Sequence, residues 1–208
     1  MTEDIKAPAR PPGRPRQQGQ ESGREGLLRV ARQEFGRKGY AATSIEDLVT
    51  IAEVKSPTLY HHFGSKRALF IAAAQDAYDR TLSNFRGALE RDASFHETLH
   101  SLIDASSVMM REEPSLQMMI CTMQFELRRD PDLGTDLRPA LRQFREFFDE
   151  VVERAPLDLR PTPQAARDLC HLLIAMVAGI ATESLLFVRS EDGDNMLDAL
   201  RRCIGPPR

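Results

Sequence analysis

The fold class follows from residues 43–70, TSIEDLVTIAEVKSPTLYHHFGSKRALF. In its first part, apolar side chains recur at intervals of three and four residues, which predicts the buried face of a short helix. After a short break, Ser56-Pro57 is typical of a helix start, with Ser56 as the N-cap and Pro57 at the first helical position. We therefore expect two short helices joined by a tight turn. The apolar residues of the first helix are Ile45, Leu48, Val49 and Ala52.

Small polar residues and a glycine mark where these helices begin and end. The first helix has two possible N-caps, Thr43 and Ser44, because each is followed three residues later by an acidic side chain. The second helix is very short, because Gly64 breaks it. Ser65 then caps a long helix that extends to about Phe85.

The rest of the chain alternates helical patterns with turn signals. One helix precedes the quoted stretch and ends at Gly39, a typical position for glycine after a helix. No strand of any length with alternating polarity is present in the sequence. The fold class is therefore expected to be all-α. The later helices are expected at residues 95–111, 115–128, about 136–155, 163–189 and 195–204.

Two short helices at residues 44–63, packed against a preceding helix, form a helix-turn-helix. This motif anchors one side of its second helix in the core and turns the other side to DNA. Leu59 and Phe63 are the expected anchors. The expected outward side carries no acidic residue, which suits contact with phosphates and base edges. Its residues are Lys55, Ser56, Thr58, Tyr60 and His61.

The segment Thr43-Ser44-Ile45 and the block Leu59-Tyr60-His61-His62-Phe63-Gly64-Ser65-Lys66-Arg67-Ala68-Leu69-Phe70 together resemble the DNA-binding domain of the TetR family of bacterial transcriptional regulators. The resemblance covers about residues 22–70. It implies an all-helical homodimer that binds a palindromic DNA operator through its N-terminal helices. It also implies a larger C-terminal domain that senses a small molecule.

The resemblance also implies roles for individual residues. Thr43 or Ser44 would hold a phosphate at the start of the first motif helix, and Lys66 would hold the DNA backbone. His61 and His62 either contact DNA or are a surface and a packed histidine with no role in binding. The residues that would face the groove or its walls are Lys55, Ser56, Pro57, Thr58 and Tyr60.

Three positions depart from the family pattern. Glu53 stands where the turn usually has glycine, Lys55 where serine is common, and Val49 where alanine is common. If the turn requires a positive φ, Glu53 is mildly strained there. Lys55 adds a cation to the expected DNA-binding side.

Charge is distributed unevenly along the chain, although its total is only −3. Residues 1–70 contain 12 Lys and Arg against 8 Asp and Glu, a net charge of +4, while residues 71–208 contain 16 against 23, a net charge of −7. The basic part is therefore expected to meet DNA. Residues 1–20 are expected to form a flexible arm, in which Gly13-Arg14-Pro15-Arg16 resembles an AT-hook. Arg14 and Arg16 either enter an A·T-rich minor groove or belong to a solvated tail.

Residues 71–208 are expected to form the ligand-binding and dimerisation domain. Many bulky and adaptable apolar side chains in this part indicate a cavity for an apolar or aromatic effector, or else a plain hydrophobic core. His171 and Glu183 are polar residues in an apolar helix, and each is either a ligand contact or a satisfied buried or interface group. The candidate ligand-binding residues are Met109, Met119, Met123, Phe125, Phe144, Phe148, His171 and Met176.

The helix expected at 163–189 is apolar on more sides than one small domain can cover. Its longest unbroken apolar run, residues 172–181, is too short to span a membrane, and Glu183 would be costly in lipid. The resemblance implies that the helices at 163–189 and 195–204 pair with their copies in a homodimer. No membrane association is expected.

Enzyme classes are not indicated by the sequence. It contains no nucleophile elbow, P-loop or dinucleotide fingerprint, and no cofactor is expected. His96 and His100 have a spacing suited to metal, but no third ligand is evident, so we expect no metal site. Three widely spaced cysteines fit a reduced, cytoplasmic location. The favoured function is a repressor released from its operator by a small ligand. An activator of the same fold is the alternative, and a helical enzyme is disfavoured.

Overall fold

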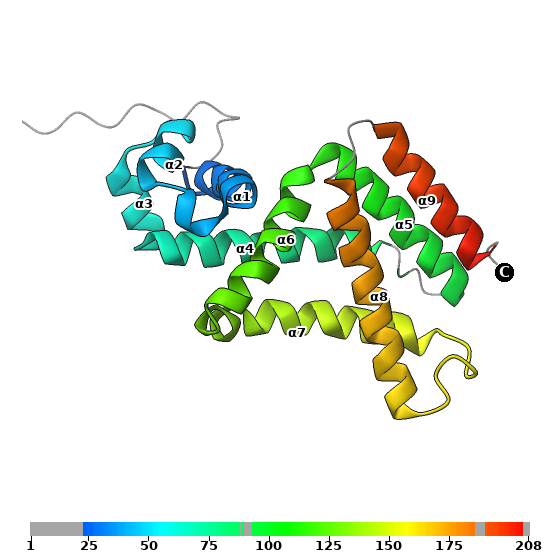
Figure 1. Ribbon diagram of the computed structural model, residues 1–208. Helices are drawn as coiled ribbons and strands as arrows, with labels where there is room; N and C mark the ends of the chain where they lie inside the picture. Colours follow the sequence, from blue (N-terminus) through cyan, green and yellow to red (C-terminus); the bar gives the residue numbers. More distant parts are fainter. Residues whose placement is uncertain (1–22, 88, 90–92, 186–189, 206–208) are drawn as a thin grey trace, which may run out of the picture.

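The computed structural model describes residues 23–87, 89, 93–185 and 190–205. All regular secondary structure in these residues is helical, as predicted (Figure 1). The first four helices are α1 (Gly23–Ala42), α2 (Ile45–Ile51), α3 (Ser56–Phe63) and α4 (Lys66–Arg86). They are followed by α5 (Phe95–Glu112), α6 (Pro114–Arg129), α7 (Asp132–Glu153), α8 (Pro163–Ser184) and α9 (Ser190–Ile204).

Helices α1 to α3 form a small bundle at one end of the molecule, joined to the rest by the long α4 (Figure 1). Leu59 of α3 and Leu48 of α2 are fully buried in this bundle, together with Phe35 of α1 and Phe70 of α4. Phe35 and Phe70 meet edge to face, with ring centroids 5.0 Å apart. This shared core fixes the position of α3 relative to α1 and α4.

The turn between α2 and α3 has the backbone that the sequence suggested. Glu53 has a φ of +53°, and it is the one residue other than glycine with positive φ in the described part of the chain. A side chain in this conformation is strained, and the Val54 amide donates to the carbonyl oxygen of Val49 across the turn, over 2.9 Å. The family's usual glycine is therefore replaced here without loss of the turn.

The capping residues refine the predicted helix starts. Ser44 is the N-cap of α2, because its hydroxyl accepts from the Asp47 amide at 3.0 Å. Ser65 caps α4 in the same way, accepting from the Ala68 amide. The expectation for α3 was wrong by one residue, because its N-cap is Lys55 and Ser56 already has helical backbone geometry. Lys55 provides no side-chain cap, so its side chain is not needed to hold the helix.

The remaining helices form the larger part of the molecule. Helix α6 packs between α1 on one side and α4, α7 and α8 on others, while α9 lies along α5 (Figure 1). Helix α7 begins at Asp132, earlier than expected, because Pro139 is accommodated inside the helix. Helix α8 ends at Ser184 with Leu185 as its C-cap, and α9 begins at Ser190, so the end expected at residue 189 and the start expected at residue 195 were both placed too late.

Candidate nucleic-acid interface and effector cavity

Helix α3 presents the predicted residues on its outward side. Lys55, Pro57 and His61 are exposed, and Tyr60 is 50% exposed, a large value for an aromatic side chain. Ser56 is half-buried. An aromatic ring, a cation and a histidine on one short surface can contact phosphates, sugars and base edges.

Thr58 is less available than its neighbours. It is half-buried, and its methyl group lies near the start of α1, where a Cβ added at Gly23 would be 3.6 Å away. Part of the Thr58 side chain therefore packs against α1. Its hydroxyl remains the only polar group that this side chain can offer to DNA.

Thr43 does not lie where the first motif helix would meet a phosphate. It is only 1% exposed, and its hydroxyl donates to the carbonyl oxygen of Gly39 at 2.8 Å. The Thr43 side chain thus secures the loop after the main part of α1, where Gly39 has a φ of +80°. Of the two residues considered, Ser44 is the one that is half-exposed and near the α2 N-terminus.

Lys66 is half-buried and packs against Tyr40. Its ammonium lies 4.5 Å from the ring centroid of Tyr40, and burial lowers the pKa of Lys66. Arg24, which the sequence reasoning did not single out, is exposed and has its guanidinium 5.4 Å from the ring centroid of Phe63. This places a second cation beside α3, at the start of α1. In the sequence, Arg24 could have been noticed as a basic residue at the start of the first helix, one residue after Gly23.

The remaining predicted basic residues, Arg14 and Arg16, lie outside the described residues, as does the rest of the expected arm at 1–20.

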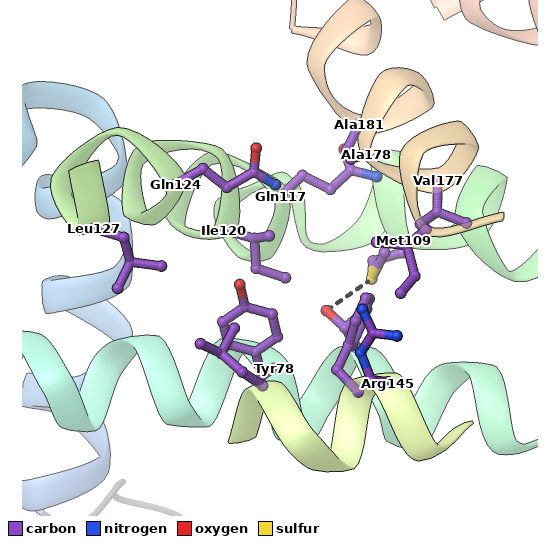
Figure 2. Close-up of a pocket in the computed structure, with 14 residues that line it drawn as sticks. Tyr78, Met109, Gln117, Ile120, Gln124, Leu127, Arg145, Val177, Ala178 and Ala181 are labelled. Atoms are coloured by element: carbon purple, nitrogen blue, oxygen red, sulfur yellow. Dashed lines mark hydrogen bonds between the residues drawn. The ribbon is translucent and has the colours of Figure 1, made fainter. Parts of the chain in front are cut away.

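A cavity of about 320 Å³ lies in the larger part of the molecule, walled by α4, α6, α7 and α8 with Met109 from α5 (Figure 2). Its walls are mostly apolar. The apolar residues that line it are Met109, Ile120, Leu127, Leu141, Phe144, Ile174, Val177, Ala178 and Ala181. The polar residues that line it are Tyr78, Thr81, Gln117, Gln124 and Arg145.

Only part of the predicted ligand-binding set lines this cavity. Met109 and Phe144 do. Phe125 is 67% exposed and lies on the surface. Three other predicted ligand-binding residues are fully buried in the hydrophobic core: Met119, Met123 and Phe148.

His171 and Met176 also lie outside the cavity wall. His171 is exposed and accepts a hydrogen bond from the Arg145 guanidinium through Nε2, over 2.5 Å. Met176 packs partly buried between the main core and a small cluster formed by Ile103, Ile180 and Leu197. The composition of residues 71–208 indicated a cavity in this part of the chain. Which residues line it depends on how the helices pack, and composition does not specify that.

Helix α6 separates the cavity from α1. Ile120 and Gln124 face the cavity, while Thr122 on another side of the same helix donates to the Gly36 carbonyl oxygen of α1 at 2.9 Å. Glu126 accepts from the Tyr40 amide, also on α1. One helix therefore contacts both the cavity and the DNA-binding bundle.

Arg32 forms a second connection between the bundle and the larger part. It is 2% exposed, and its guanidinium donates to Asp76 of α4 and to Glu113 at the start of α6, the latter at 2.7 Å. Arg67, at the start of α4, pairs with Asp130 and Asp136 beyond the end of α6. The residues that flank α6 are thus tied to neighbouring helices, Glu113 to α1 and Asp130 to α4.

Residues 27–73 match the family model described as bacterial regulatory proteins, tetR family. The repressor KstR2 of Mycolicibacterium smegmatis is 33% identical over 155 residues, which cover 74% of each chain. The activator FasR of the same organism is 34% identical over 83 residues, and the match spans only 38% of its length. A solved structure of the fatty acid degradation regulator FadR from Bacillus halodurans matches with a TM-score of 0.67 at 17% identity, covering 90% of this chain and 94% of that one.

The fold and the exposed α3 define a helix-turn-helix transcriptional regulator that binds DNA, and not an enzyme. The chain belongs to the TetR family. Its relatives include a repressor and an activator, so the family alone does not fix the direction of regulation.

Groups of three or more His, Cys, Asp or Glu that could hold a metal are absent from the described residues. His100 is instead held by the carbonyl oxygen of Gly205, 2.7 Å from its Nε2. Helix α8 is long and apolar enough to cross a membrane by length and composition, a test that core and interface helices of soluble proteins also pass.

Proposed function

We propose that this protein is a cytoplasmic repressor that a small, largely apolar effector releases from a palindromic operator. The observation that carries the proposal is the position of α6, which lines the cavity with Ile120, Gln124 and Leu127 and contacts α1 through Thr122. An effector that fits the cavity better in one position of α6 would shift the protein toward that position. A repressor named among the relatives supports the direction of regulation.

The proposed DNA contacts centre on the start of α3. Lys55, Tyr60 and His61 are exposed there, with Ser56, Pro57 and Thr58 beside them. Ser44 at the α2 N-terminus is the proposed phosphate contact, supported by its exposure and by the adjacent helix N-terminus. We add Arg24 to this set. In the dimer, two α3 helices about 34 Å apart would enter successive major grooves.

The proposed dimer forms through α8 and α9, with residues 71–208 as the ligand-binding and dimerisation domain. Leu172 of α8 is 64% exposed, and Ala175 and Gly179 are exposed one and two turns later. Small residues beside a large apolar one allow two helices to approach closely and bury apolar surface. A dimer accounts for the apolar side of α8 without a membrane.

The function is tested by fluorescence anisotropy with DNA fragments from upstream of the protein's own gene. The expected result is nanomolar, salt-sensitive binding to one fragment. Tyr60→Ala should weaken it at least about tenfold, since it removes an exposed aromatic contact. Leu159→Ala, an exposed position between α7 and α8, is the matched control and should leave it unchanged. No binding to any upstream fragment at low salt would overturn the proposal.

The direction of regulation is tested separately by transcription in vitro from the bound fragment. Repression by the protein is expected. Stimulation of transcription would make it an activator of the same fold.

A further inference from the structure

Arg145 is a cation in the wall of a mostly apolar cavity. It is half-buried on α7, and the partner recorded for its guanidinium in the described residues is the imidazole of His171. No carboxylate of the described residues forms a salt bridge with Arg145. The charge of the guanidinium is therefore not balanced by a direct partner.

The carboxylates near Arg145 are engaged elsewhere. On the same helix, Glu146 pairs with Arg142. Asp149, one turn further along, forms no salt bridge with Arg145 among the described residues; burial together with this carboxylate raises the pKa of the nearby Cys170 thiol to about 11.

Tyr78 adds a second hydrogen-bond donor to the same cavity. Its hydroxyl points into the cavity from α4 (Figure 2), and no hydrogen bond to this hydroxyl is recorded in the described residues. Burial raises the pKa of Tyr78 to about 12, so the phenol keeps its proton at neutral pH. A group that keeps its proton can donate to an oxygen of a ligand.

The side-chain amide of Gln117 can also donate a hydrogen bond to an oxygen of a ligand. Its oxygen accepts from the Ser184 hydroxyl at 3.1 Å, which leaves its NH₂ group for the cavity. Arg145, Tyr78 and Gln117 each offer a donor to a mostly apolar cavity, whose other polar lining residues are Thr81 and Gln124. A ligand with hydrogen-bond acceptors can therefore pair with these donors. Next to Arg145 an anionic acceptor forms the strongest hydrogen bond, because both partners are charged.

We propose that the effector is a small apolar carboxylic acid whose carboxylate pairs with Arg145. Its apolar body lies among Ile120, Leu127 and Phe144, and the Tyr78 hydroxyl donates to an oxygen of the ligand. The volume of about 320 Å³ is at the small end for ligand sites, so a single short chain or one aromatic ring with a short acid side chain fits. This proposal rests on the proposed function and specifies the chemical class of its effector.

The probes are two matched pairs, decanoate with 1-decanol and 4-phenylbutyrate with 4-phenyl-1-butanol. Each pair has the same apolar body and differs in the charged end. Isothermal titration calorimetry with the full chain should show that at least one acid binds at least about tenfold more tightly than its alcohol. Equal affinities in both pairs, or no acid binding below about 1 mM, would overturn the proposal.

Variants identify the residue responsible. Arg145→Gln should remove the preference for the acid while the alcohol still binds, and Arg145→Lys should keep part of it because the charge remains. Arg142→Gln is the matched control, one turn earlier on α7, exposed and paired with Glu146, and should bind like the wild type. An acid preference that survives in Arg145→Gln would contradict the role of Arg145. Circular dichroism melting of each variant establishes that it is folded.

Operator binding is measured on the same samples. If operator binding is intact and no acid binds, the effector class is wrong and the DNA-binding function stands. If operator binding is absent as well, the proposed function itself fails.

Discussion

Thr122 of α6 donates a hydrogen bond to the carbonyl oxygen of Gly36 on α1, with 2.9 Å between the two oxygens. The two helices meet closely at this point. A Cβ added at Gly36 would lie 3.0 Å from the Met118 Cβ and 3.1 Å from the Met119 amide nitrogen. A side chain at this position of α1 would crowd α6, so glycine favours the close approach of the two helices.

Thr122→Val removes this hydrogen bond and keeps the shape of the side chain. We expect a loss of about 1 kcal/mol in the free energy of unfolding, because the Gly36 carbonyl loses a partner in a close contact. We also expect faster amide hydrogen exchange in α1 than in the wild type. Urea denaturation and hydrogen exchange measure the two effects. Thr122→Ser keeps the hydroxyl and should behave like the wild type; equal losses in both variants would show that the hydrogen bond is not the cause.

Arg32→Ala breaks the ion pairs that connect α1 with α4 and α6. Its side chain is buried, and its removal leaves Asp76 and Glu113 without this guanidinium, so we expect a loss of about 3 kcal/mol. Arg142→Ala breaks a pair in which both side chains are exposed and should cost less than about 1 kcal/mol. Urea denaturation compares the two variants. A similar small loss of unfolding free energy in both variants would mean that the ion pairs of Arg32 contribute little to the packing of α1 against α4 and α6.

Tyr78 predicts how stability responds to high pH. Its pKa is raised from 10.0 in a model compound to about 12 in the folded chain, because burial disfavours the phenolate. Above pH 10 the unfolded chain loses this proton while the folded chain retains it, so stability falls as pH rises from 10 to 12. The two-unit shift corresponds to about 3 kcal/mol in total. Tyr78→Phe should remove this part of the decline in urea denaturation between pH 9 and pH 11 (about the accessible range); an unchanged decline would contradict the assignment.

Leu172→Glu should separate the proposed dimer. Leu172 is 64% exposed on α8, and a carboxylate there would be buried without a partner when two copies meet. Analytical ultracentrifugation should give a dimer for the wild type and a monomer for the variant. Leu157→Glu changes a side chain that is 73% exposed between α7 and α8 and should remain dimeric. A wild-type monomer, or a dimeric Leu172→Glu, would place the interface elsewhere.

The DNA-binding bundle was predictable from the sequence because its signals are local. Ser65 and Gly64 set the start of α4 and the end of α3, and the positive φ of Glu53 followed from the position of the turn. The exception is Thr43, whose burial depends on the path of the chain after Gly39. Thr43 and Ser44 show the same capping pattern in the sequence, so the pattern does not indicate which of the two is buried.

The cavity was less predictable because its wall combines residues far apart in the chain. Tyr78 of α4, Ile120 of α6 and Arg145 of α7 meet only after the helices pack. Phe125 and Met123 belong to the same helix and share the same composition signal, yet one is exposed and the other is fully buried. Their exposure differs because the two side chains point to different sides of α6, and residue type alone does not specify which side is buried.

The salt dependence of operator binding tests directly whether α3 contacts DNA. Lys55 is exposed at the start of α3 and unconstrained by a capping role, so each copy is expected to neutralise one phosphate. For a dimer, Lys55→Ala should lower the slope of log affinity against log salt by about 2, and Arg142→Ala on α7 should not change it. An unchanged slope and affinity for Lys55→Ala would contradict the placement of α3 on DNA.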